Sequence, residues 1–315
     1  MSNHSSSSVL KLTIRLLLGV FFIGTAVLKL LSIDNFEVYI YSFGIVNFVT
    51  VTFLSRLLIF IELLIGISLI LKIYFRQIWW LTMLMMLGFT IFLIYAAIFR
   101  NDSTCHCFGS LIELDPKQSI IKNLITIALL LIIRKEKSHD YKPVLKKWLV
   151  GISIAISIII PFVLVPMDVI FNKIYSEKEN VNTVAFYESL SDSTFVDLQH
   201  GRYLINYALA GCKYCRIGAE KLTLMADRHQ IPHNRIKFII GGSDEAIARF
   251  VEITSTSDYQ HWKIPAPQFM SITYGKFPLY VLIEDGKIVK AGDFRILDDA
   301  IFIFLQYCQD SRRAT

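Results

Sequence analysis

The N-terminal half of this sequence contains five apolar stretches that are separated by short polar segments. A helix needs roughly 20 apolar residues, with about 17 as the lower limit, to cross the hydrocarbon core of a bilayer. The fourth stretch is the shortest, and we expect flanking residues to extend it. We therefore expect transmembrane helices over approximately residues 9–31, 54–73, 79–99, 119–133 and 148–165.

The composition indicates two kinds of domain. The 315-residue chain is 54% hydrophobic with a mean hydropathy of +0.51, which is too apolar for one ordinary soluble domain. From Phe171 onward, however, charged, polar and apolar residues are mixed as in a globular domain. We predict a membrane α-helical bundle followed by an α/β domain. The expected limits are a four-helix membrane domain at 1–147, a fifth transmembrane helix and linker at 148–170, and an extracytoplasmic domain at 171–315.

Basic residues indicate which ends of the helices face the cytoplasm, because short cytoplasmic loops are rich in lysine and arginine. Lys11 and Arg15 lie at the start of the first helix, and Lys72 and Arg76 follow the second. The basic segment 134–147 follows the fourth helix and so falls on the same side. The three groups agree on one topology, with the N-terminus inside.

This topology places the loop 100–117 and everything after Val165 outside the cytoplasm. It also accounts for the formal net charge of +6 without a nucleic-acid partner. Acidic residues are frequent in the C-terminal half, and basic and aromatic residues are not interleaved there, so we expect the bilayer and not nucleic acid as a partner.

Four of the five cysteines form two close pairs, and the second pair lies in the sequence GCKYC at 211–215. This motif follows the apolar run 203–209 and precedes 216–229, which has helical character. The pattern predicts a strand, a turn and a helix. The five cysteines are Cys105, Cys107, Cys212, Cys215 and Cys308.

The position of the second pair predicts a different role for each sulfur. Cys212 is expected at the helix N-terminus, where unpaired amides, the helix dipole and neighbouring Lys213 favour a thiolate. Cys215 is expected within the first helical turn, close enough to attack a mixed disulfide formed by Cys212. We therefore predict Cys212 as the attacking thiol and Cys215 as the resolving thiol.

A structural disulfide or half of a zinc site is the alternative for this pair. Zinc normally takes four protein ligands in a structural site, and no second C-x-x-C or H-x-x-x-H follows in this domain. We therefore expect redox chemistry of the pair, with no metal and no cofactor.

Further elements are predicted downstream: a strand at 236–240, a helix at 243–253 with Ser243 as N-cap, a strand at 279–283, a turn at 285–286, a strand at 287–289 and a helix from Asp298. The order β-α-β-α-β-β-α, with the Cys-x-x-Cys motif after the first strand, resembles the thioredoxin superfamily. The similarity is to TlpA-like membrane-tethered thioredoxins and covers about residues 183–309. It implies a cis proline beside the cysteines, at Pro278.

Two positions differ from the thioredoxin pattern. Gly211 stands where a tryptophan often precedes the first cysteine, and Asn206 stands where thioredoxin has a buried acid. Proton transfer through such an acid is therefore not expected here. The dipeptide Lys213-Tyr214 replaces the Gly-Pro of strongly reducing thioredoxins and leaves the direction of electron flow open.

The first cysteine pair has a C-x-C spacing, in which a disulfide is strained and easily reduced. Its sequence TCHCFG at 104–109, with the Lys122-Asn123 that follows, resembles the MauE and DoxX-like membrane family over residues 10–133. That family is implicated in maturing periplasmic quinoproteins and in sulfur redox or respiratory chemistry. His106 could tune the thiols of Cys105 and Cys107 or complete a soft metal site, or it could be an exposed loop residue. Further residues of the resemblance are Arg15, Gly19, Phe21, Lys29, Phe36, Arg56 and Glu62.

Two charged residues of that set, Lys29 and Glu62, fall inside predicted membrane helices. Charges at such depth need partners or water, so we expect the two to pair with each other. The pair could line a functional polar pocket, or it could be structural; Lys29 could also reach the interface instead.

Together these features predict a membrane-bound thiol-disulfide oxidoreductase of the bacterial inner membrane. Cys105 and Cys107 would exchange with Cys212 and Cys215, which act on thiols or disulfides of extracytoplasmic proteins during their maturation or redox control. Two alternatives stay open: copper handling by the cysteine pairs, and a redox-inert assembly factor for a periplasmic or respiratory protein.

Overall fold

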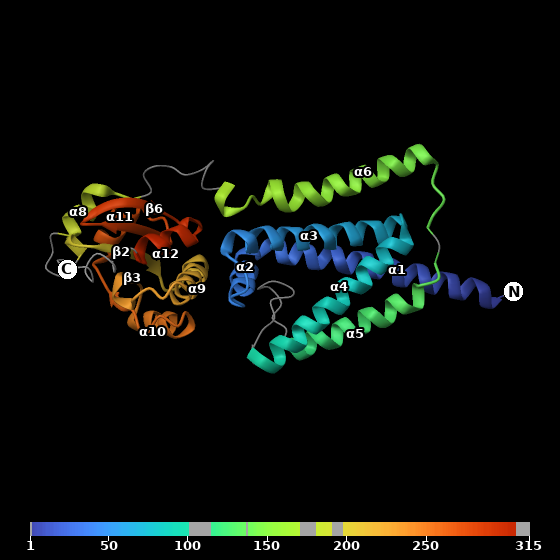
Figure 1. Ribbon diagram of the computed structural model, residues 1–315, viewed down its shortest axis with the longest axis horizontal. Helices are drawn as coiled ribbons and strands as arrows, with labels where there is room; N and C mark the ends of the chain where they lie inside the picture. Colours follow the sequence, from blue (N-terminus) through green and yellow to red (C-terminus); the bar gives the residue numbers. More distant parts are fainter. Residues whose placement is uncertain (1, 101–114, 137, 171–180, 191–197, 307–315) are drawn as a thin grey trace. The chain divides into compact units, whose positions relative to one another are not determined.

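The computed structural model describes residues 2–100, 115–136, 138–170, 181–190 and 198–306 (Figure 1). The chain forms two compact units, one comprising Met1–Tyr39 and Val51–Pro166, the other Ile40–Thr50 and Met167–Thr315. The first is helical, and the second contains a mixed β-sheet. This confirms the predicted fold class of a membrane helical bundle followed by a thioredoxin-like α/β domain.

Five helices of the described chain are long and apolar enough to cross a membrane, as predicted. They are α1 (Ser2–Leu31), α3 (Phe48–Leu71), α4 (Phe75–Tyr95) with its π-helical extension Ala96–Arg100, α5 (Pro116–Ile133), and α6 (Pro143–Ile159) with its π-helical extension Ile160–Leu164. A short helix, α2 (Ile33–Tyr41), follows α1 and was not predicted. The protein is thus a multi-pass membrane protein.

Polar residues explain why helix α5 begins earlier than the hydropathy predicts. Helix α5 begins at Pro116 because Asp115 forms a capping box with Gln118: the Gln118 amide donates to the Asp115 carboxylate at 2.6 Å. Proline at the first helical position needs no hydrogen-bond partner for its nitrogen. Capping and proline chemistry therefore decide the start of this helix, and apolarity does not.

Helices α1 and α3 approach closely through two glycines, and they lie side by side in Figure 1. A Cβ atom built on Gly66 would lie 2.8 Å from the carbonyl oxygen of Gly19, and one built on Gly19 would lie 3.0 Å from that of Gly66. Small residues that let helix backbones meet are typical of membrane bundles. The contact explains the glycine at position 19 in the sequence resemblance.

Replacing Gly66 with alanine is expected to destabilise the bundle by about 1–3 kcal/mol, because the methyl group would push two backbones apart. Gly24→Ala on α1 is the matched control, since a Cβ there meets no atom within 4 Å. Thermal unfolding of the detergent-solubilised chain, followed by circular dichroism, measures both. Equal stability of the two variants would contradict the close contact.

The second unit is built on a five-stranded sheet of order β4-β3-β2-β5-β6. Strands β2, β3 and β4 are parallel, while β5 and β6 are antiparallel to their neighbours. The strands are β2 (Arg202–Leu209), β3 (Ile236–Gly241), β4 (Gln260–Trp262), β5 (Leu279–Glu284) and β6 (Lys287–Gly292). The helices are α8 (Thr183–Leu190), α9 (Lys213–Arg228), α10 (Asp244–Ile253), α11 (Ala266–Thr273) and α12 (Asp299–Gln306).

Several local predictions are confirmed in this unit. Ser243 caps α10 by accepting a hydrogen bond from the Ala246 amide, and Asp285 and Gly286 join β5 to β6 with φ of 48° and 75°. Positive φ at both residues is what a tight hairpin turn requires. The predicted order of elements was incomplete, however, because it lacked α8, β4 and α11. Strand β4 has only three residues, two of them polar, and its pairing with β3 is a long-range contact that no local pattern reveals.

Successive side chains of the central strand β2 point to opposite faces of the sheet. Ile205 and Tyr207 point to one face, where they share a buried cluster with Phe186 of α8 and Phe269 of α11. Asn206 points to the opposite face, which is covered by α9. The cysteine motif connects this strand to this helix.

Candidate functional site

The Cys-x-x-Cys pair lies where β2 leads into α9, as the sequence predicts. Cys212 is the N-cap of α9, and its sulfur accepts a hydrogen bond from the Cys215 amide at 3.3 Å. The Cys215 sulfur accepts one from the Leu209 amide at the end of β2, at 3.4 Å. Both cysteines are free thiols.

The two thiols differ in exposure. Cys212 is partly exposed, whereas Cys215 is 0% exposed. Burial, and secondarily the hydrogen bond and charge of Cys212, raise the pKa of the Cys215 thiol far above its ordinary value. Cys215 is therefore protonated at neutral pH while the pair is reduced. An accessible first sulfur and a shielded second one match the predicted attacking and resolving roles, which stay predictions.

Pro278 lies at the same end of the sheet as the cysteines. The Phe277–Pro278 peptide bond is cis, the conformation implied by the thioredoxin resemblance, and it directly precedes β5. Because β5 runs antiparallel to β2, with Leu279 opposite Tyr207, the start of β5 and the end of β2 share one edge. The participation of Pro278 in the site stays a prediction.

The surface beside Cys212 is open on one side and aromatic on the other. A Cβ at Gly211 would meet no atom within 4 Å, so the absence of the tryptophan leaves free space before the first thiol. Exposed Tyr214 stacks on Phe294, with 6.1 Å between ring centroids and an interplanar angle of 15°. The start of α9 is thus open at Gly211 and bordered by the exposed Tyr214 ring.

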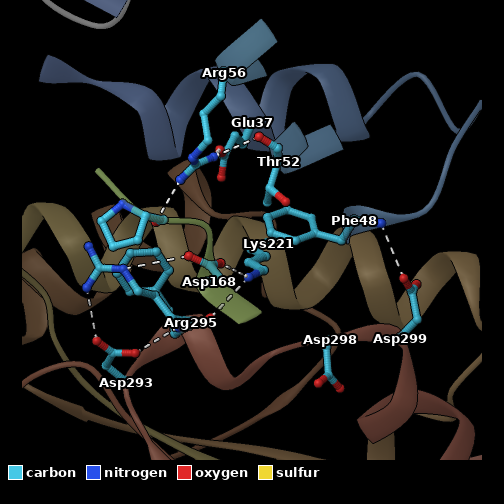
Figure 2. Close-up of polar contacts among 12 residues, drawn as sticks. Glu37, Phe48, Thr52, Arg56, Asp168, Lys221, Asp293, Arg295, Asp298 and Asp299 are labelled. Atoms are coloured by element: carbon cyan, nitrogen blue, oxygen red, sulfur yellow. Dashed lines mark hydrogen bonds and ion pairs between the residues drawn. The ribbon is translucent and has the colours of Figure 1, made fainter. Parts of the chain in front are cut away.

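A partly buried charge network that the sequence reasoning missed holds the segment Phe294–Ile296 against α9 (Figure 2). The Lys221 ammonium donates to Asp168 and to the carbonyl oxygen of Phe294, both at 3.2 Å. Arg295 pairs with Asp168 at 3.7 Å and with Asp293 at 3.3 Å. The sequence analysis assigns Asp168 to the linker at 148–170. The one sequence signal for this network is Lys221, a lysine on the buried side of the amphipathic helix α9.

In the helical unit, Lys29 and Glu62 form the predicted pair. The ammonium of Lys29 lies 2.8 and 2.9 Å from the two carboxylate oxygens, and Thr25 contacts the same carboxylate at 3.4 Å. Both charged side chains are buried. The geometry fits a structural ion pair, and Lys29 does not reach toward an interface.

Arg56 is a second buried charge of the sequence resemblance, and it is 1% exposed. Its guanidinium pairs with Glu37 and donates to the carbonyl oxygen of Thr52 at 2.8 Å (Figure 2). It also donates to the carbonyl oxygens of Val165 and Pro166, both at 2.9 Å. This residue ties α3 to α2 and to the end of the last membrane helix.

The first cysteine pair falls outside the described residues, as do His106 and Cys308. The structure therefore brings Cys212, Cys215 and Pro278 to the same end of the sheet, while their common role and the roles of Cys105 and Cys107 stay sequence predictions. Within the described ranges, no three His, Cys, Asp or Glu side chains come together as a metal site requires.

A thioredoxin-like domain with a Cys-x-x-Cys at a helix N-terminus, attached to five membrane helices, defines a membrane-associated protein of thiol-disulfide oxidoreductase-like type. Residues 7–134 match the family model described as Methylamine utilisation protein MauE. Protein TlpB of Flavobacterium psychrophilum is 29% identical over 280 residues, covering 71% of this chain and 74% of that protein. No solved structure matches significantly. The predicted combination of a MauE-like membrane region with a TlpA-like thioredoxin domain is confirmed.

Proposed function

We propose that this protein is a membrane-bound thiol-disulfide oxidoreductase that relays electrons between Cys105–Cys107 and Cys212–Cys215. The observation that carries the proposal is the asymmetric pair of free thiols at the start of α9, one accessible and one buried. Thiol-disulfide exchange needs an attacking thiolate and a second thiol that resolves the mixed disulfide.

In the reducing direction, the Cys212 thiolate attacks a client disulfide, and the departing client sulfur takes up a proton. Cys215 then attacks the sulfur of Cys212 and releases the second client sulfur, which is also protonated. The client gains two electrons, and Cys212 and Cys215 form a disulfide. The thiols of Cys105 and Cys107 reduce this disulfide by the same exchange; in the oxidising direction every step is reversed.

The proposed location is a bacterial inner membrane, with the domain at 171–315 outside the cytoplasm. The membrane domain comprises 1–147, and 148–170 provides a fifth helix and a linker. The basic residues Lys11, Lys72 and Arg134 lie near ends of α1, α3 and α5 that this topology assigns to the cytoplasmic side. The proposed clients are extracytoplasmic proteins with exposed thiols or disulfides, because both cysteine pairs then share one compartment with them.

The full-length Cys215→Ala variant is expected to accumulate mixed disulfides in cells, because Cys212 can still attack but nothing resolves the product. Non-reducing electrophoresis followed by mass spectrometry identifies the partner as a client or as Cys105 or Cys107. Blocking intact cells first with a membrane-impermeant maleimide is expected to prevent the adducts.

The double variant Cys212→Ala/Cys215→Ala is the control and forms no adduct. Absence of a Cys212-linked species from cells grown under both oxidising and reducing conditions would contradict the proposed function. Adducts that form despite the impermeant reagent would contradict the proposed topology.

A further inference from the structure

Two buried polar side chains near the cysteine motif take no part in the thiol-disulfide exchange proposed for Cys212 and Cys215. Asn206 of β2 and Tyr280 of β5 lie directly opposite each other across the antiparallel pair, and both are 0% exposed. Among the described residues, neither the Asn206 amide nor the Tyr280 hydroxyl forms a hydrogen bond of good geometry, although the Asn206 side chain acts on the Tyr280 hydroxyl as a hydrogen-bond partner. Buried polar groups almost always form well-aligned hydrogen bonds, so three atoms without one in the same place require an explanation.

The Tyr280 hydroxyl lies against the helix turn that carries Cys215. Its oxygen is 2.5 Å from the position that a Cβ of Gly218 would occupy, so only glycine leaves room for it there. Gly218 is three residues after Cys215 and therefore on the same face of α9. Tyr280 also lies within electrostatic reach of both cysteines: burial raises the pKa of its hydroxyl, and negative charge on Cys215 raises it further.

The attack of Cys215 on the mixed disulfide of Cys212 requires hydrogen-bond donors around the Cys215 sulfur. Cys215 must become a thiolate to attack, and its apolar surroundings oppose that charge. Burial raises the pKa of this thiol more than the backbone amides of Leu209 and Cys215, which act on its sulfur as hydrogen-bond donors, lower it. Asn206 stands where a buried acid would act as a base, and a neutral amide cannot remove the proton. A hydroxyl and an amide can instead stabilise the thiolate once it forms.

We propose that the Tyr280 hydroxyl donates a hydrogen bond to the Cys215 thiolate during resolution, and that Asn206 is a positioning residue whose amide N–H donates to the Tyr280 oxygen. The inference rests on the proposed function. The chain from Asn206 through Tyr280 to Cys215 strengthens the final hydrogen bond by mutual polarisation. Tyr280 keeps its own proton throughout.

The step balances without a further reactant. Cys215 gives up its thiol proton, its sulfur bonds to the Cys212 sulfur, and the bond from Cys212 to the client sulfur breaks. The leaving client sulfur takes up one proton. Among the residues that the structure describes, the ionisable groups that act on Cys215 or Tyr280 are Cys212 at the start of α9 and Asp293 before the Phe294–Ile296 turn, besides Cys215 and Tyr280 themselves.

The test separates the two attacks in one full-length, detergent-solubilised chain carrying Cys105→Ser, Cys107→Ser and Cys308→Ser. One equivalent of the chromogenic disulfide dithiobis-nitrobenzoate releases coloured thiolate in two phases. The first phase is attack by Cys212, and the second is resolution by Cys215. Stopped-flow absorbance across pH gives a rate and a pH midpoint for each phase.

Tyr280→Phe is expected to slow the second phase about tenfold or more and to move its midpoint to higher pH, because the thiolate loses a donor. Asn206→Leu is expected to act in the same direction with a smaller effect. Tyr207→Phe is the matched control: Tyr207 is equally buried, but it points to the opposite face of the sheet. It should leave both phases unchanged.

A Tyr280→Phe protein whose second phase keeps its rate and pH midpoint would overturn the inference. The same slowing in Tyr207→Phe would also overturn it, because the effect would then be general to the sheet. Absence of the first phase from the parent chain would instead refute the proposed function, so the two failures are distinguishable.

Discussion

Replacing Cys212 with serine is expected to lower the rate of protein disulfide reduction at least about a thousandfold. The hydroxyl of serine is not ionised near neutral pH, so the covalent intermediate cannot form. The structure leaves no substitute in the described site, because the other thiol, Cys215, is fully buried and accepts a hydrogen bond from Leu209. The measurement is the steady-state reduction of a model protein disulfide by the purified full-length chain with an excess of dithiol.

Cys215→Ser is the informative comparison for this prediction. It retains the accessible Cys212, so it should still form one mixed disulfide per chain while turnover falls. The assignment of the two sulfurs is wrong if Cys212→Ser keeps turnover within a few-fold of the wild type. It is also wrong if Cys215→Ser, and not Cys212→Ser, loses the ability to attack the protein disulfide.

Arg56→Met is expected to destabilise the membrane unit by about 3–5 kcal/mol, because it removes the cation that pairs with the buried Glu37 carboxylate. Arg56 also supplies hydrogen bonds to the carbonyl oxygens of Thr52, Val165 and Pro166, which lose this donor. The measurement is thermal unfolding in detergent, followed by the far-ultraviolet circular dichroism of the helices.

The double variant Arg56→Met/Glu37→Met is expected to recover much of this stability, since it removes both charges together. Lys263→Met is a control for the loss of an ion pair as such, because Lys263 and Asp244 pair at 2.7 Å on the exposed surface. A loss in Arg56→Met no larger than in Lys263→Met would show that the buried pair is not a major source of stability.

The elements with strong local signals were predictable from the sequence. Five long apolar runs require five membrane helices, and the apolar strand before the motif places Cys212 at a helix N-terminus. Ser243 was predictable as an N-cap because its side chain accepts a hydrogen bond from the amide of Ala246, which is close in sequence. Such features depend on residues only a few positions apart, so one sequence contains all the information they need.

Other parts of the site depend on contacts between distant residues. Asn206 lies opposite Tyr280 because of the register of β2 and β5, and Asp168, which accepts a hydrogen bond from Lys221, lies far from it in sequence. Strand β4 has no independent signal, because it is a strand only through its pairing with β3. The relation of Cys105 and Cys107 to the second pair stays a sequence prediction.

The sequence by itself determined the membrane helices, the type of globular domain and the two sulfurs at its helix N-terminus, because periodicity, capping and motif spacing act locally. Only the tertiary structure decided that Cys215 is enclosed while Cys212 is partly open, and that polar groups without well-aligned hydrogen bonds lie beneath the motif. Burial is a property of the whole packed domain, and it is burial that sets the cost of charging each sulfur.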